Sequence, residues 1–232
     1  MQNEPNIHAV LGIFVNDAKA FRQVLRDTGA LLWGPPIVDL LRGEHTTAKE
    51  LTIFVPPDPP DALAKLKYAF DENGYTWFAG AQPVFQRGEL HFWIQMVPEG
   101  EAERWGLSLE SLVLQTSMST AGACFMTWEY AVGVYPTLLD RRICMGLVAP
   151  AESPERAKAG MLKETRSFQR TGFRLPEKDD PAWDLQEVMQ DRKLGDEHCR
   201  VIRFGEDGQG VAAPYEQRGG ALLLVYRGLL AD

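Results

Sequence analysis

The chain has 232 residues, of which 45% are apolar, 10% aromatic and 24% charged, as in an ordinary soluble globular protein. Its 32 acidic residues against 24 basic ones give a net charge of −8, which argues against broad binding of nucleic acid. Because the composition does not change abruptly, we expect one compact unit, with a core over residues 1–150 and a C-terminal supplement over 151–232.

The N-terminal sequence MQNEPNIHAV has neither the basic start nor the long apolar run of a signal peptide, and no segment is as apolar as a membrane-spanning helix. We therefore expect a cytoplasmic protein without a membrane partner. The 3 cysteines are far apart and predict no disulfide framework. Cys199 follows His198, but a tetrahedral metal site needs two further ligands, so no metal is expected there.

The first hundred residues predict alternating helices and strands. Caps, glycine stops and apolar spacing mark the elements, which are a helix from its Asn16 cap to Gly29, a strand over Ala30–Trp33, a short helix over Ile37–Leu41 after Gly34-Pro35-Pro36, a strand over Leu51–Val55, a helix from its Asp58 cap to Gly74, and a hairpin of Thr76–Gln86 and Glu89–Val97.

From Ser108 to Pro136 the spacing of apolar residues predicts mainly helix, with the small-residue run SMSTAGACFMTW as a tightly packed helix start and Pro136 as its end. The remainder predicts an α+β supplement. Its expected elements are helices over Ser153–Thr171 and Asp184–Lys193, strands over Arg200–Phe204 and Ala221–Tyr226, and a loop at GEDGQG.

Two groups of residues are candidate phosphate contacts. Ser117, Ser119 and Thr120 precede an expected helix, where hydroxyl groups either bind an anion or cap the helix. Lys163, Arg166 and Arg170 are spaced to share one helix face, which is either a triphosphate clamp or an ordinary solvated face.

Aromatic side chains are candidates for a ligand cleft. Trp33, Trp93, Trp128 and Tyr135 could line a groove that recognises an apolar or planar ligand, or could serve as core residues.

Six segments in a fixed order resemble a known group of proteins. They are FRQVLRDTGALLWGPP, ELTIFVP, DENGY, HFWIQMVPEG, LQTSMSTAGACFMTWEYAVGVYP and KETRSFQRTGF. Their order resembles that of nucleotidyltransferase-like proteins of the DNA polymerase beta superfamily from mushroom-forming fungi, over Phe21 to Phe204. The resemblance implies an α/β (α+β) fold with a mixed sheet flanked by helices, a glycine-serine turn that holds triphosphate, and an acid-x-acid strand that holds magnesium.

The resemblance also assigns site positions, and several of them depart from the family pattern. Gly34 matches the turn glycine, whereas Pro35 replaces its serine. Glu50 and Thr52 stand where the family has two aspartates, so the second metal ligand is lost. Gln95 matches a family glutamine on the strand where related enzymes carry a third acid, and a neutral amide is a weaker magnesium ligand. Ser119 and Thr120 agree with the family pattern.

Three functions are compatible with this sequence. The first is a nucleotidyltransferase-fold protein that lacks ordinary two-metal catalysis and binds a nucleotide or a protein partner in the inherited cleft. The second is an active nucleotidyl- or phosphoryl-transferring enzyme that uses magnesium, Glu50 and a rearranged carboxylate, namely Asp39, Glu44 or Asp58. The third is an enzyme of unrelated chemistry with an aromatic-lined cleft. Magnesium is the only cofactor that the sequence suggests, and only for the second function.

Overall fold

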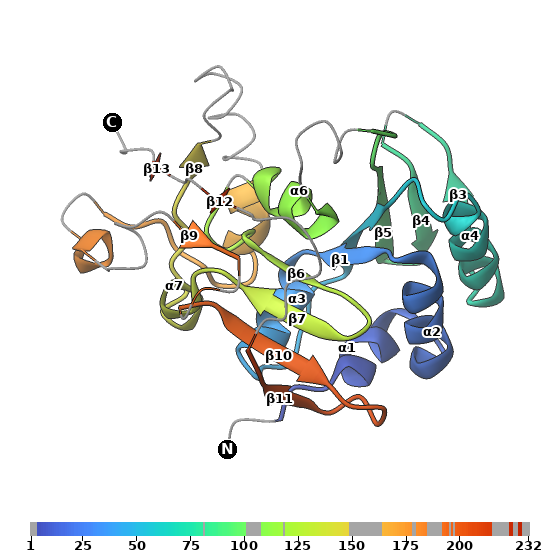
Figure 1. The fold of residues 1–232 in the computed structure, drawn as a ribbon, viewed down its shortest axis with the longest axis horizontal. Coiled ribbons are helices and arrows are strands. Elements are labelled where there is room, and N and C mark those ends of the chain that lie inside the picture. The colour runs from blue at the N-terminus through green and yellow to red at the C-terminus, as the bar shows by residue number, and fades with distance from the viewer. Residues whose placement is uncertain are drawn as a thin grey trace.

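A nine-stranded mixed sheet is the centre of the computed structural model, which describes residues 4–80, 82–100, 108–117, 119–148, 164–177, 180–184, 192–194, 196, 198–214, 223–224 and 227–228. Its strands are β1 (Leu31–Trp33), β2 (Glu50–Val55), β3 (Thr76–Phe78), β4 (Val84–Arg87), β5 (Leu90–Met96), β6 (Cys124–Met126), β7 (Tyr130–Gly133), β10 (Arg200–Phe204) and β11 (Gly210–Ala212). Their spatial order is β11-β10-β7-β6-β1-β2-β5-β4-β3 (Figure 1).

Strands β2 and β5 are paired in parallel, and the other neighbouring pairs are antiparallel. Further elements are α1 (Ile7–Phe14), α2 (Ala18–Thr28), α3 (Pro35–Leu41), α4 (Ala62–Glu72), α6 (Leu109–Gln115), α7 (Pro136–Asp140), a 3-10 turn (Pro181–Asp184), and two small pairs, β8 (Leu147–Val148) with β13 (Arg227–Gly228) and β9 (Arg192–Lys193) with β12 (Leu223–Leu224). Residues 164–169 are also helical.

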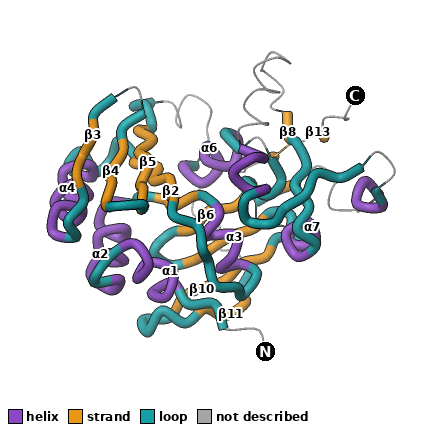
Figure 2. Tube along the Cα trace, turned by 180° about the vertical axis from the view of Figure 1, so that it is seen from behind, coloured by secondary structure: helices purple, strands orange, loops and turns teal. Residues whose placement is uncertain are grey.

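The two faces of the sheet form two separate cores, because successive strand residues point to opposite sides. Leu32 of β1 packs with Ile53 and Phe92 in a cluster that α1, α2, α3 and α4 complete. The neighbouring Leu31 packs with Phe54 in a second cluster, to which α6 contributes. In the ribbon view and in the tube view from behind, α6 lies above the middle strands and α1 and α2 lie below them (Figures 1 and 2).

The first half of the chain folds largely as its sequence predicts. The expected strands correspond to β1 and β2, and the predicted turn at Gly88 joins β4 to β5. The single strand expected over Thr76–Gln86 is wrong, because this segment forms two antiparallel strands, β3 and β4. Helix α2 is capped by Asp17, one residue after the expected Asn16, because the Asp17 carboxylate accepts a hydrogen bond from the Ala20 amide at 2.9 Å. Helix α4 is preceded by Asp61 as its N-cap residue, so the prediction of Asp58 was wrong.

The segment after Ser108 differs from the prediction. Ser108 does cap α6, but the small-residue run continues into the antiparallel hairpin of β6 and β7 instead of a helix. Pro136 begins α7, whereas it was expected to end a helix. Both hairpin strands are buried on both faces, and a short apolar run of that kind has no alternation to distinguish it from a buried helix.

The C-terminal third contributes to the same sheet. The predicted strand over Arg200–Phe204 is confirmed as β10, which lies between β7 and β11. Of the predicted helix over Ser153–Thr171, residues 164–169 are helical and residues 153–163 lie outside the described part. The helix predicted for Asp184–Lys193 is replaced, where described, by the 3-10 turn before it and by β9 at its end.

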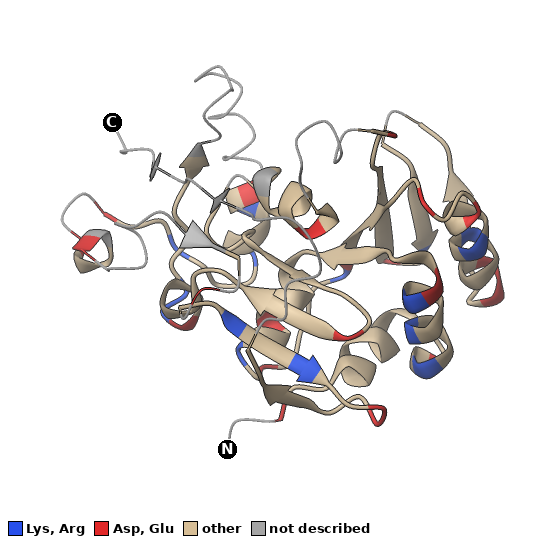
Figure 3. Ribbon diagram, in the orientation of Figure 1, with Lys and Arg blue, Asp and Glu red and all other residues tan. Residues whose placement is uncertain are grey.

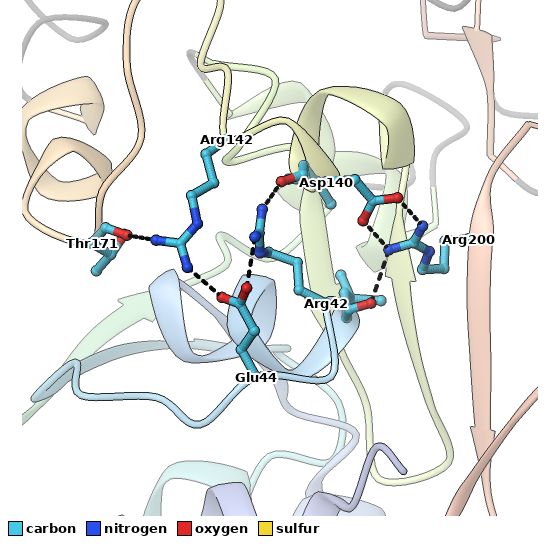
Figure 4. A network of polar contacts seen from close by, with 8 residues as sticks. Arg42, Glu44, Asp140, Arg142, Thr171 and Arg200 are labelled. Carbon is cyan, nitrogen blue, oxygen red and sulfur yellow. Dashed lines mark hydrogen bonds and ion pairs between the residues drawn. The ribbon is translucent and has the colours of Figure 1, made fainter. Parts of the chain in front are cut away.

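A network of ion pairs fixes the loop that follows α3 (Figure 4). Glu44 accepts hydrogen bonds from Arg42 at 2.7 Å and from Arg142 at 2.8 Å. Arg42 also donates to the carbonyl oxygen of Leu139 in α7, and Arg142 donates to that of Thr171 at 3.0 Å. The loop is thereby joined to α7 and to the segment before residue 177.

A second arginine extends this network to β10. Arg200 donates to both carboxylate oxygens of Asp140, at 2.8 and 2.7 Å, and to the carbonyl oxygen of Leu41 at 3.0 Å (Figure 4). Because Leu41 ends α3, Asp140 ends α7 and Arg200 begins β10, one side chain links three elements that are distant in sequence. Within the described residues, no helix is long and apolar enough to cross a membrane.

Candidate functional site

A cavity of about 570 Å³ lies over β1, β2 and β5, on the face opposite helices α1 to α4. Three of the described lining residues are aromatic, two are acidic, and the others carry neutral polar groups. They are Trp33, Phe54, Trp93, Glu50, Glu164, Gln82, Gln95, Thr52, Thr116 and Ser167. The volume is within the range of small-molecule sites.

Strand register brings the central lining residues together. Trp33 of β1 lies directly opposite Thr52 of β2, and Thr52 lies directly opposite Trp93 of β5. Directly opposite residues on neighbouring strands point to the same face of a sheet. Two indole side chains therefore flank Thr52, and the next row towards the strand ends pairs Phe54 with Gln95.

All three positions that the resemblance assigns to metal-binding acids line this cavity. Glu50 and Thr52 are two residues apart on β2 and therefore point to the same face, towards the cavity. Gln95 lies on the neighbouring strand β5. Within the described residues, no three His, Cys, Asp or Glu side chains gather to hold a metal ion. Of the three positions, only Glu50 is a carboxylate, whereas bridging two magnesium ions requires several carboxylates.

Glu164 is a second carboxylate of the cavity that the sequence did not reveal. Its Oε1 accepts a hydrogen bond from the Ser119 hydroxyl at 2.6 Å, and that hydroxyl accepts one from the Gly122 amide at 3.0 Å. On the other side of Gly122, its carbonyl oxygen accepts a hydrogen bond from Trp33 Nε1 at 2.6 Å. The small-residue run thus forms a wall on which Glu164 and Trp33 are both anchored.

The hydroxyl groups predicted to contact phosphate have other partners. Ser119 and Thr120 are both buried. Ser119 holds Glu164, as described above, and the Thr120 hydroxyl accepts a hydrogen bond from the Met145 amide at 2.9 Å. Neither is among the residues described as lining the cavity. In this structure the two residues support the wall of the cavity rather than presenting hydroxyls to a ligand.

The turn at Gly34 and Pro35 also differs from a phosphate cradle. Gly34 has a φ of 129°, in the region that favours glycine, and α3 begins at Pro35. Pro35 and Pro36 have no amide hydrogen, and the Ile37 amide donates to the Gly34 carbonyl oxygen at 3.0 Å. The first three helix residues therefore offer no amide group to a phosphate.

The predicted basic clamp is not found at the cavity in the described structure. Lys163 lies outside the described residues, and Arg166 and Arg170 are exposed rather than among the lining side chains. The same helical segment instead presents Glu164 and Ser167 to the cavity. Figure 3 shows both signs of charge on α2 and α4, whereas β1, β2 and β5 carry no Lys or Arg.

Two of the four candidate aromatic residues lie away from the cavity. Trp33 and Trp93 line it, as expected for an aromatic cleft. Trp128 lies in the turn between β6 and β7 with the Arg26 guanidinium 4.8 Å from its ring centroid. Tyr135 is buried in the second core cluster. The cleft prediction missed Phe54, which looked like an ordinary core residue of a buried strand.

The carboxylates proposed for a rearranged metal site lie elsewhere. Asp39 is buried in α3, where burial raises the pKa of its carboxyl group. Glu44 is held by Arg42 and Arg142, and the hydrogen bond from Arg42 is the main cause of its lowered pKa. Neither these two nor Asp58 is among the described lining residues. Among the described lining residues, the second acid beside Glu50 is Glu164, which belongs to a different element.

Two buried thiols, those of Cys124 and Cys144, lie near Glu164. Burial raises the pKa of Cys144 to about 11 and raises that of Cys124 further, and Glu164 adds to both effects. No disulfide joins any of the three cysteines in the structure. A thiol with a raised pKa is a poor nucleophile at neutral pH, so these residues serve as core.

Comparisons with known proteins identify the fold and not the family. No family model and no curated protein matches the sequence. A CCA-adding enzyme in its apo form superposes with a TM-score of 0.50 at 17% identity, over 74% of this chain and 43% of that one. The Thermotoga maritima CCA-adding enzyme complexed with tRNA gives 0.49 at 18% identity, over 82% and 46%.

The chain therefore spans less than half the length of these solved structures. At such low identity the likeness concerns the arrangement of helices and strands, while the chemistry has to be argued from the site itself. The mixed α+β architecture of this chain, a nine-stranded sheet with flanking helices, is similar to the fold of the apo enzyme over 74% of this chain. The chain has a nucleotidyltransferase-like fold similar to that of CCA-adding enzymes.

Proposed function

We propose that this protein has a nucleotidyltransferase-like fold without ordinary two-metal catalysis, and that its cavity binds a small ligand with a planar ring. The observation that carries the proposal is the row Trp33, Thr52, Trp93 across three neighbouring strands. It puts a threonine where a metal-binding acid is needed and puts an indole on each side of it. On this proposal the site lacks the metal ligands of an active enzyme and has walls suited to ring stacking.

The electrostatics of the cavity support the absence of phosphoryl chemistry. Nucleotidyl transfer depends on metal ions and cationic groups that neutralise charge on the transferred phosphate. The described lining residues include Glu50 and Glu164 but no Lys or Arg, and the start of α3 offers no amide donor. A triphosphate would therefore meet negative charge, whereas an uncharged ring would meet aromatic walls.

Metal-dependent nucleotide binding tests the first half of this proposal. The pure protein is heated with ATP, GTP, CTP or UTP, each with magnesium and with a chelator, because a ligand of the folded state raises its apparent stability. We expect no magnesium-dependent shift for the wild type. We expect Thr52→Asp, which restores the second acid of β2, to acquire such a shift with at least one nucleotide.

Thr116→Asp is the matched control, because Thr116 also lines the cavity but belongs to the end of α6. Thr116→Asp adds the same negative charge to the cavity, but it does not restore a second acid on β2. A magnesium-dependent shift in the wild type would overturn the proposal, and equal shifts in the two variants would show that the strand position has no special role.

Quenching of tryptophan fluorescence by quinoline tests the second half. We expect saturable binding that Trp93→Leu weakens by roughly fivefold, since an aromatic pair contributes about 1 kcal/mol beyond burial. Trp77→Leu is the control, because Trp77 lies on β3 against Phe85, with ring centroids 4.6 Å apart. Equal weakening by both substitutions, or no saturable binding at all, would refute ligand binding between the two indoles.

A further inference from the structure

We infer that the cavity prefers an organic cation, meaning a planar or compact group that carries a positively charged nitrogen. This inference rests on the proposed function and specifies its ligand. The acids, the aromatic walls and the absence of described basic residues in the lining all concern the same 570 Å³ cavity. Each of these features favours a positive ligand over a neutral or negative one of the same shape.

The negative charge of the cavity comes from two separate elements. Glu50 begins β2 and Glu164 lies on the helical segment after residue 163, so the two carboxylates reach the cavity from different parts of the fold. No Lys, Arg or His is among the described residues that line it. The remaining polar lining groups are the neutral amides of Gln82 and Gln95 and three hydroxyls. Charge in the described lining is therefore negative.

Glu164 is held in a fixed position by neighbouring groups. Its hydrogen bond to Ser119 is 2.6 Å long, and Ser119 is fully buried. An added Cβ on Gly122 would lie 2.8 Å from Glu164 Cδ, which shows how closely the carboxylate approaches the backbone. A preorganised carboxylate recognises a cation with less loss of side-chain entropy than a mobile surface acid.

The aromatic walls are suited to cation–π contacts. Lys67 Nζ lies 4.5 Å from the ring centroid of Trp77, and Arg26 covers Trp128 in the same manner. No such internal cation lies over Trp33 or Trp93 in the described residues. Trp33 packs edge-on with Phe168, with ring centroids 6.2 Å apart, and His91 stacks beside Trp93 at 6.1 Å. A cation from outside would therefore meet the parts of these two indoles that line the cavity. Tryptophan is the side chain that binds cations in this way most strongly.

Three quinoline-based probes of nearly equal shape test the inference, namely N-methylquinolinium, quinoline and quinoline-2-carboxylate. Binding to the full chain is followed at pH 8 by tryptophan fluorescence. We expect the cation to bind roughly tenfold more tightly than the neutral ring, and the anion to bind most weakly. The advantage of the cation should fall as salt is raised, because screening weakens charge–charge attraction.

Conservative variants test whether Glu164 and Glu50 cause the preference for a cation. Glu164→Gln keeps an oxygen that accepts from Ser119 and removes the charge, so it should weaken binding of N-methylquinolinium and leave that of quinoline unchanged. Glu50→Gln should act in the same direction. Glu72→Gln, at the exposed end of α4, is the control and should change neither affinity.

The outcomes separate this inference from the proposed function. Equal binding of cation and neutral ring would overturn the cation preference and leave the ring-binding site in place. Tighter binding of the anion would overturn it as well. If none of the three probes binds, both proposals fail together. A cation preference that persists unchanged in the double variant Glu50→Gln, Glu164→Gln would contradict the assignment to these carboxylates.

Discussion

Gly122 is the residue on which the geometry of the cavity wall depends. Its amide donates to Ser119, its carbonyl oxygen accepts from Trp33, and Glu164 packs against its Cα. A Cβ at this position would clash with Glu164 Oε1 and would lie 3.2 Å from Trp33 Cζ2. The close approach of a carboxylate and an indole to one backbone unit therefore requires glycine.

We expect Gly122→Ala to lower the free energy of unfolding by roughly 1–3 kcal/mol, as overpacking does in a dense site. The substitution should also displace Glu164 and weaken binding of N-methylquinolinium. Urea unfolding measures the first effect and fluorescence titration the second. Gly12→Ala is the control, because a Cβ on Gly12 meets no atom within 4 Å and alanine favours the helix α1.

A double-mutant cycle tests whether Glu164 causes the loss of stability in Gly122→Ala. In a Glu164→Ala background, Gly122→Ala should cost clearly less than in the wild type, because the clashing carboxylate is absent. An undiminished cost would show that Trp33, or the backbone itself, makes glycine necessary.

At the scale of elements, α3 and the loop after it hold two acids with opposite pH behaviour. Burial raises the pKa of Asp39 above its usual value of 3.8, although the hydrogen bond from Thr46 partly offsets this. The hydrogen bond from Arg42 leads the causes that lower the pKa of Glu44 from 4.5. The folded state thus binds a proton on Asp39 more tightly than the unfolded state does, and on Glu44 less tightly.

We expect Asp39→Asn and Glu44→Gln to change stability in opposite directions as pH varies. The contribution of Asp39 is present at low pH and is lost as pH rises through its raised pKa. The free energy of unfolding of Asp39→Asn should therefore rise relative to that of the wild type as pH increases above the usual carboxyl pKa of 3.8. The contribution of Glu44 is present at neutral pH and is lost on acidification, so Glu44→Gln should be least favourable near pH 7.

Urea unfolding of both variants and the wild type at several pH values measures these differences. Each variant serves as the control for the other, since both replace a carboxylate by its amide. A common direction of change for the two variants would contradict the opposite pKa shifts.

The sequence predicts helices and strands well where glycine and proline signals at their ends agree with the periodicity of apolar residues. The β1–α3–β2 segment has a helix stop at Gly29, prolines at the helix start and a separate apolar strand, and all of these appear in the structure. The β6–β7 hairpin has no such signals, because both strands are buried on both faces by elements distant in sequence. The hairpin pairs with β1 on one side and with β10 on the other, and the spacing of residues within the hairpin sequence does not reveal these partners.

The same distinction applies to the candidate site. Glu50, Thr52, Trp93 and Gln95 share a cavity because each strand alternates, and alternation is visible in a sequence. Glu164 joins them from a segment that follows far later in the chain, beyond β6 and β7, through a contact with Gly122. The spacing of Lys163 and Arg166 predicted a basic helix face in this segment. In the structure it is the acidic Glu164 that lines the cavity, because of its tertiary contacts.

At the scale of the whole molecule, the C-terminal third is part of the central sheet. Strand β10 lies between β7 and β11, and the Arg200 side chain binds both α3 and α7. In addition, the buried Arg22 of α2 donates to the carbonyl oxygens of Phe204 at 3.1 Å and Gly205 at 2.6 Å. A core over residues 1–150 would therefore leave one edge of β7 without its partner β10, and Arg22 would keep Trp128 as its one remaining carbonyl acceptor among these three.

We accordingly predict that the chain unfolds in a single cooperative transition. Far-ultraviolet circular dichroism reports the sheet and helices, and tryptophan fluorescence reports Trp33 and Trp93 at the cavity. Both should give the same midpoint and the same dependence on urea, as two-state behaviour requires. Limited proteolysis should yield no stable fragment that ends near residue 150. Two separated transitions, or a protease-resistant fragment of residues 1–150 that retains its circular dichroism, would show instead that the C-terminal supplement is an independent unit, and that β10 is added to a sheet already stable without it.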